Sequence, residues 1–204
     1  MKPIDAVRSN LQQEIAVAAA CLVVEDGLAY ASAKRRALRQ LGLDAHTALP
    51  DDAALEAAVR AHIALYCAPS QAAELKALRE TALHWMERLA RFRPHLCGSV
   101  WHGSATRHSD IELELFCDDP KSAEWALIDQ RLDYRVSSRP GELTATLCLR
   151  TPCIGLGRDT QLLLRLRDLD RLRGALKPDA QGRKPRADAQ ALRSRLQQIE
   201  DDRP

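Results

Sequence analysis

The spacing of the apolar residues changes once along this 204-residue chain, and that change limits the folds it can adopt. Residues 1–92 are rich in Ala, Leu, Arg, Glu and Gln and poor in Gly, which is typical of helices. The segment 110–117, DIELELFC, alternates instead between acidic and apolar residues, as a half-buried strand does. The sequence therefore predicts an α+β protein with a helical N-terminal half followed by a small mixed sheet.

Local signals place the individual elements. The helices of the first half are expected over about 5–25, 30–42, 53–67 and 70–92. Gly42 is a favourable residue for a helix end, and Asp51 or Asp52 is a favourable N-cap. In the second half, Asp119 and Pro120 predict the start of another helix. Further strands are expected over 133–138, 143–150 and 160–167, and a basic loop and a short terminal helix after about 175. The expected divisions of the chain are 1–92, 93–176 and 177–204.

Composition restricts the class of protein. Apolar residues make up 46% and charged residues 28%, as in soluble globular proteins, and a net charge of +2 is far from that of a strongly basic nucleic-acid binder. No run approaches the 18 or so apolar residues of a membrane helix, and the first residues are too polar for a signal peptide. The six cysteines are scattered and form no CxxC motif. We therefore expect a cytoplasmic protein with reduced, structural thiols and no membrane partner, and zinc binding or disulfides are the alternatives for the cysteines.

One segment has the residues for phosphate chemistry. Asp110 and Glu112 leave the same face of the predicted strand, about 7 Å apart along it, and can converge on one divalent cation. Upstream, Gly98 and Ser99 form a turn that opens a short helix, whose free amides and serine hydroxyl can hold a phosphate. A phosphate site beside a metal site is the arrangement that phosphoryl or nucleotidyl transfer requires.

The spacing of these residues resembles a known signature. The pattern is Gly-Ser, three residues, Gly, five residues and Ser-Asp-x-acid, and it runs from Gly98 to Glu112 without insertion. It resembles the signature of the DNA polymerase β-like nucleotidyltransferase superfamily, over about 95–170. The resemblance implies that the second half is a nucleotidyltransferase-like domain. It also implies that the domain moves a nucleoside monophosphate from an NTP to a hydroxyl of an unknown acceptor and releases pyrophosphate.

The resemblance also implies roles for individual residues. Asp110 and Glu112 would be the catalytic acids and would bind Mg²⁺ or Mn²⁺. Contacts to the nucleotide and its phosphates would come from four further positions, Gly98, Ser99, Gly103 and Ser109. The NTP is the implied partner, and the sequence does not indicate a nucleic acid as the acceptor.

The chain departs from the family pattern at the acids. The second acid is usually Asp, and Glu112 is longer by one methylene. The family usually carries a third carboxylate on a neighbouring strand. In the strand predicted over 143–150, the face away from the leucines has no acid, and only Glu142 lies in line with it, at the start. Glu114 is the other candidate, further along the first strand. A site without a third acid has a weaker general base and a weaker second metal position.

Other functions remain open at this stage. A domain that kept the fold and lost the third acid would bind a nucleotide or a protein without reacting. Arg79 and His84 have the Arg-x4-His spacing of HEPN ribonucleases, but five helical residues rotate by about 140°, so these side chains should diverge. The arginine-rich segment 33–42 is a weak candidate for DNA binding. Trp101 is either a packing residue or a platform for stacking on a base.

Overall fold

The computed structural model describes residues 3–137, 145–173 and 184–201. The chain forms two compact units, Met1–Ala72 and Ala73–Pro204, which meet inside the helix α4 (Ala68–Arg88). The change in apolar spacing near residue 93 marks the beginning of the first strand, β1 (His95–Cys97), whereas the compact units divide earlier in the chain. Most of α4 therefore belongs to the same unit as the sheet.

The first unit is helical. It contains α1 (Pro3–Asp26), α2 (Tyr30–Gln40), α3 (Asp52–His62) and a π-helical turn, Ile63–Cys67. Asp51 caps α3 by accepting a hydrogen bond from the Ala54 amide at 2.7 Å, as its position predicted. The helices enclose a separate core that includes Ile15, Leu55 and Val59. The helix expected over 53–67 thus changes its winding near its end.

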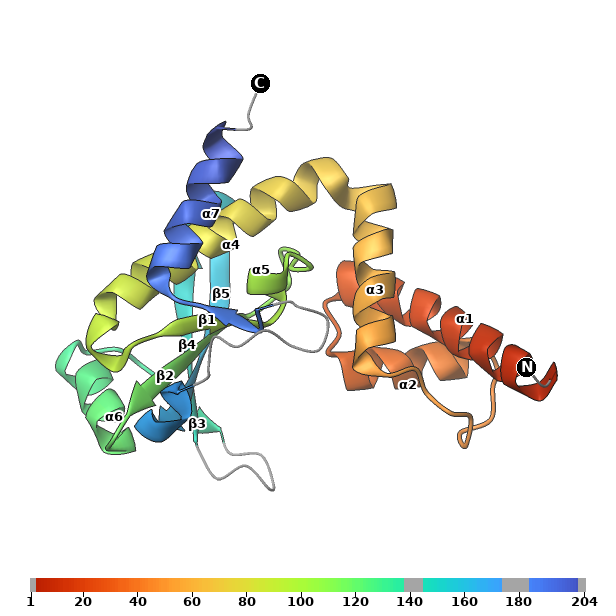
Figure 1. Cartoon of the computed structure of the whole chain (residues 1–204), viewed down its shortest axis with the longest axis horizontal. Helices are drawn as coiled ribbons and strands as arrows, with labels where there is room; N and C mark the ends of the chain where they lie inside the picture. Colours follow the sequence, from red (N-terminus) through yellow and green to blue (C-terminus); the bar gives the residue numbers. More distant parts are fainter. Residues whose placement is uncertain (1–2, 138–144, 174–183, 202–204) are drawn as a thin grey trace. The chain divides into compact units, whose positions relative to one another are not determined.

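The second unit is built on a six-stranded mixed sheet (Figure 1). Besides β1, its strands are β2 (Ile111–Cys117), β3 (Arg135–Ser137), β4 (Thr146–Cys153), β5 (Arg158–Asp168) and β6 (Arg186–Ala187). Their order is β3-β4-β5-β2-β1-β6, and β2 lies parallel to β5 while the other pairs are antiparallel. The prediction of an α+β protein with a helical first half and a mixed sheet is confirmed.

Helices cover one face of this sheet. The buried cluster joins leucines of β2, β4 and β5 to residues of α4, α6 (Pro120–Asp129) and α7 (Ala189–Asp201). Trp85 of α4 is buried there and donates its indole N–H to the Thr151 hydroxyl at 2.8 Å. Asp119 caps α6 through the Lys121 amide, as predicted. The apolar side of the alternating strand therefore faces this core.

The strand β2 separates its side chains as its sequence predicted. Ile111, Leu113 and Leu115 are fully buried on the helix-covered face. The residues between them point to the opposite face, which we call the acid face of β2. Glu112 is half-buried there, and Glu114 is only 5% exposed. The acid face is therefore not a solvated surface over its whole length.

Two further features were not expected. The short strand β6 lies in the segment predicted to be a basic loop, and it pairs with β1. Gly155 approaches α4 so closely that an added Cβ would lie 2.5 Å from the Ala77 Cβ, so this position admits no side chain. In the part of the chain that the structure describes, no helix combines the length and apolar character needed to span a bilayer.

Candidate functional site

The register of β1 and β2 brings the Gly-Ser turn against the acid face. Cys97 is the partner of Glu112, and Gly98 follows it as the first residue of the short helix α5 (Gly98–His102). Gly98 has a φ of +69°, and a Cβ at this position would lie 3.0 Å from the Glu112 Cδ. A glycine is needed here both for the left-handed backbone and for the close approach of the carboxylate.

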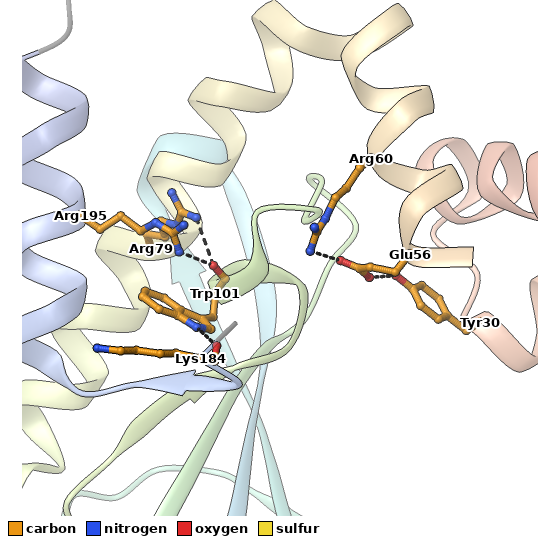
Figure 2. Close-up of polar contacts among 7 residues, drawn as sticks. All are labelled: Tyr30, Glu56, Arg60, Arg79, Trp101, Lys184 and Arg195. Carbon is orange, nitrogen blue, oxygen red and sulfur yellow. Dashed lines mark hydrogen bonds and ion pairs between the residues drawn. The ribbon is translucent and has the colours of Figure 1, made fainter. Parts of the chain in front are cut away.

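Two arginines hold the other end of α5, as Figure 2 shows. Arg79 of α4 donates to the Val100 carbonyl at 3.1 Å, and Arg195 of α7 donates to the Trp101 carbonyl at 2.7 Å. The Arg195 guanidinium also lies over the Trp101 ring, 4.4 Å from its centroid. Cations favour a helix C-terminus, where carbonyl groups are free. Burial and the nearby Arg195 lower the pKa of Arg79 to about 10. These contacts hold the C-terminal end of α5 in place, and Gly98 at its other end lies next to β2.

The remaining residues of the predicted signature have visible structural roles. Gly103 ends α5 with a φ of +92° and donates its amide to the Ser99 carbonyl at 2.8 Å. Ser109 closes the turn before β2, because its hydroxyl accepts from the Thr106 amide at 3.0 Å. The half-buried Ser99 makes no side-chain hydrogen bond to any residue that the structure describes. Of these three residues, Ser99 is the one whose side chain is available for a phosphate.

Asp110 lies directly before β2 and is half-buried. Burial and the nearby Glu112 carboxylate raise its pKa. Within residues 3–137, 145–173 and 184–201, no hydrogen bond or ion pair to the Asp110 side chain is found. This carboxylate is therefore close to a second acid and has no cation to compensate it, which is the electrostatic condition that favours a bound metal ion.

Arginines compensate the other two acids of this face. Arg165 of β5 forms an ion pair with Glu112, with 2.7 Å between Nη2 and Oε2. Arg167 lies 3.0 Å from the nearly buried Glu114, which also pairs with Arg186 of β6. The pairs on β5 are diagonal, since Arg165 is the backbone partner of Glu114 and reaches back to Glu112. Each arginine occupies space that a metal ion would otherwise share.

The position of a third acid depends on which strand lies next to β2. The strand next to β2 is β5, and β4 lies one strand further out. On β5, Leu163 is the partner of Glu112, and Gln161 and Arg165 share its face. Glu142 lies outside the described residues. Asp159, which the sequence pattern did not indicate, is on the same face of β5 because it lies two residues before Gln161. No periodicity marked it, because the neighbour of β2 was not known.

Asp110 borders an open pocket of about 880 Å³ at the β3–β4–β5 side of the sheet. Asp159 and Asp133 line the same pocket, and Gly98 and Ser99 do not. Its basic lining residues are His108, Arg131, Arg135, Arg150 and Arg158. The volume is in the range of small-molecule sites, and four guanidinium groups suit an anionic ligand. Asp110 thus borders the basic pocket, while the adjacent acid Glu112 lies against the Gly-Ser turn.

The acid pair fits one oxygen-liganded cation. Asp110 has no competing partner among the described residues, and the ion pair of Arg165 with Glu112 joins Nη2 to Oε2. Mg²⁺ is commonly held by one or two carboxylates together with substrate phosphates. The only close group of three His, Cys, Asp or Glu ligands in the described chain lies in the first unit, so three protein ligands do not converge at Asp110. The donor set suits a single Mg²⁺ or Mn²⁺ that is completed by a phosphate, and it does not suit two ions.

The Arg79 and His84 pair does not form a site. Arg79 is 4% exposed and bonded to α5, whereas His84 is exposed to solvent. Their divergence follows from the helical rotation. Trp101 is partly buried against the core, and its indole N–H donates to the Lys184 carbonyl at 2.7 Å (Figure 2). It is thus a packing residue that holds α5 to the segment before β6.

Two solved structures align with part of this chain. No family model matches the chain, and no curated protein matches it. Two solved structures of Cid1, one in complex with the UTP analogue UMPNPP and one with its short product ApU, align with 48% of this chain. Identity is 20% and 21%, the TM-score is 0.37 for both, and the alignments cover 31% and 32% of the Cid1 chains. A likeness of this size does not establish a family, so the proposed function rests on the geometry.

Proposed function

We propose that the second unit binds a nucleoside triphosphate together with one Mg²⁺ or Mn²⁺ ion, and that it transfers the nucleoside monophosphate to a hydroxyl group. The observation that supports this best is the position of Asp110. It is a half-buried acid beside Glu112, it has no partner among the described residues, and it borders a basic pocket. A cation bridging Asp110 and a phosphate would relieve the repulsion between the two acids.

Different residues bind the cation and the phosphates. Asp110 is the principal ligand of the cation, and Glu112 contributes its Oε1, since its ion pair with Arg165 is made through Oε2. The Ser99 hydroxyl donates to a phosphate oxygen. Arginines of the pocket, such as Arg150 and Arg158, neutralise further phosphate charge. The bound cation supplies charge neutralisation at the phosphate that reacts.

The transfer forms one bond and breaks another. The acceptor oxygen attacks the α-phosphorus of the NTP, and the bond between that phosphorus and the β-phosphate oxygen breaks, so pyrophosphate leaves. The acceptor hydroxyl must also lose a proton. Asp159 of β5 lines the same pocket as Asp110, and we assign it to accept that proton. This role is the one that the third carboxylate would fill.

A second candidate is a module that binds the nucleotide without transfer. The ion pair between Arg165 and Glu112 favours it, because a guanidinium already neutralises one of the two acids. In this case the cation would bind more weakly, and the second metal position would be absent. The two candidates agree on nucleotide binding and differ only in the release of pyrophosphate.

Two measurements on the full chain test both candidates. NTP binding is measured by calorimetry with Mg²⁺ and with EDTA, and pyrophosphate release is followed with the four NTPs and a pool of small hydroxyl acceptors. Metal-dependent binding with pyrophosphate release supports the transferase, and binding without release supports the module. Equal binding with Mg²⁺ and EDTA, or no binding, contradicts the proposed site.

A further inference from the structure

A second group of metal-binding side chains lies in the first unit, far along the chain from the acid face. Cys21 and Glu25 are four residues apart on α1, so they lie on the same side of that helix. His62 is the last residue of α3. One ligand atom from each of these three residues lies within 4.8 Å of the other two. This arrangement is the only one of its kind in the part of the chain that the structure describes.

The Nε2 atom of this histidine has no hydrogen-bond partner among the described residues. It is buried and lies 3.7 Å from Oε1 of Glu25. Only 13% of the His62 side chain is exposed, and its ring packs on Tyr66 with 4.9 Å between centroids. Buried polar atoms are normally satisfied, so an imidazole nitrogen with no described hydrogen-bond partner beside a thiol and a carboxylate is available to bind a metal ion.

The backbone after His62 brings another thiol close. The turn Ile63–Cys67 is π-helical, and the i→i+5 hydrogen bonds of such a turn place residues five apart nearly above one another. Cys67 is five residues after His62 and is partly buried against the same core. Burial, a hydrogen bond to Glu25 and nearby groups that include Asp26 and Cys67 raise the pKa of the Cys21 thiol. Single π-turns in helices often lie at functional sites.

We propose that Cys21, Glu25 and His62 bind one Zn²⁺ ion, with Cys67 nearby but outside this group of three ligands. A thiolate, an imidazole nitrogen and a carboxylate are ligands typical of zinc, whereas Mg²⁺ and Ca²⁺ select oxygen ligands alone. Zinc–ligand bonds of about 2.0–2.3 Å require the ligand atoms to lie roughly 3.5 Å apart in a tetrahedron. Small side-chain rotations bring atoms that now lie within 4.8 Å to that separation. Binding releases the thiol proton of Cys21, and the zinc cation then takes the place of that proton beside Glu25.

The site is reachable from solvent. Cys21 and Glu25 line a pocket of about 400 Å³ between α1 and α2, together with Asp26 and Arg36. The ion pair of Arg36 with Asp26, at 3.2 Å, leaves Glu25 as the pocket carboxylate that faces the thiol. A zinc ion bound here would link α1 to the end of α3. It would therefore stabilise the first unit and have no part in the proposed nucleotide chemistry.

The test compares zinc content and stability. The full-length protein is purified without chelator, and its zinc is counted by elemental analysis. We expect about one zinc per chain, and at least a tenfold weaker zinc affinity in Cys21→Ser and in His62→Gln. Co²⁺ should give a sulfur-to-cobalt charge-transfer band in the wild type that Cys21→Ser lacks. Cys148→Ser and His84→Gln, which change a half-buried thiol and an exposed histidine of the second unit, should leave zinc content and that band unchanged.

Two results would overturn the zinc site. One is a zinc affinity that Cys21→Ser and His62→Gln leave unchanged, which would place any bound zinc elsewhere. The other is a zinc-free protein whose melting temperature does not respond to added Zn²⁺. A disulfide between Cys21 and Cys67 would be one cause of this result and would equally contradict the zinc site. The melting temperature of reduced protein with and without Zn²⁺ decides this, even if one variant folds poorly.

Discussion

The position directly before β2 and the middle of its acid face differ in how their acidic charges are compensated. In the middle, Glu114 is 5% exposed and is held by Arg167 and Arg186. Directly before the strand, Asp110 is half-buried next to Glu112 and has no cation among the described residues. Both regions arise from the same acid-apolar alternation. The difference shows that alternation identifies which acids share a face, while the neighbouring strands decide which of them is available to a ligand.

The largest expected effect on stability follows from removing the charge of the compensated acid, Glu114. Glu114→Gln removes the charge that holds two guanidinium groups in a nearly buried setting, and we expect the free energy of unfolding to fall by about 3 kcal/mol. Glu87→Gln is the matched control, because the pair of Glu87 with Arg193 is about half exposed and should contribute under about 1 kcal/mol. Urea denaturation of both variants measures the difference. Equal losses of unfolding free energy in the two variants would mean that the buried ion pairs of Glu114 contribute no more than an exposed pair.

The next effect concerns the contact between Gly98 and Glu112. Gly98→Ala places a side chain at a φ of +69° and against the Glu112 carboxylate, so we expect a loss of about 2 kcal/mol and weaker metal binding. Gly157→Ala has nearly the same backbone, with a φ of +63°, and no atom within 4 Å of the new Cβ. It should cost about 1 kcal/mol from the backbone alone and leave metal binding unchanged. If Gly157→Ala reduced metal binding equally, the Gly98 contact would have no role.

A smaller effect on stability is expected where arginine competes with the cation. Arg165→Gln should free Glu112, raising Mn²⁺ affinity in the presence of an NTP by about tenfold, or about 1.4 kcal/mol. The same change should cost under about 1 kcal/mol of stability, since the pair is partly exposed to solvent. Arg193→Gln on α7 is a control for the loss of one positive charge. Weaker metal binding in Arg165→Gln would show that the guanidinium assists the site.

The smallest effect is a dependence of stability on pH. Burial and Glu112 raise the pKa of Asp110 in the folded protein, so the folded state holds this proton more tightly than the unfolded chain does. Stability from this group is therefore lost as pH rises through the folded-state pKa. The stability of Asp110→Asn relative to the wild type should increase between a pH below about 3.9 and neutral pH, without metal. A difference that stays constant with pH would contradict the raised pKa.

The sequence predicted the fold class and the local geometry around the candidate site. Local signals act over a few residues and were therefore predictive. The helix starts were predicted from Asp51 and Asp119, and the two faces of β2 from its alternation. The order of the strands is set by long-range packing. For this reason the third acid was sought on β4 instead of β5, and the arginines at Glu112 and Glu114 were not foreseen.

The central claim is that the uncompensated Asp110 holds a divalent cation. The most direct test is a titration of Mn²⁺ into the full chain with a non-hydrolysable NTP analogue, followed by electron paramagnetic resonance. Asp110→Asn keeps the shape of the side chain and removes its charge, and Asp129→Asn changes an exposed acid at the end of α6 as a control. We expect Mn²⁺ affinity to fall at least about tenfold, or 1.4 kcal/mol, in Asp110→Asn and to stay unchanged in Asp129→Asn. Superimposable curves for the wild type and Asp110→Asn would contradict the claim.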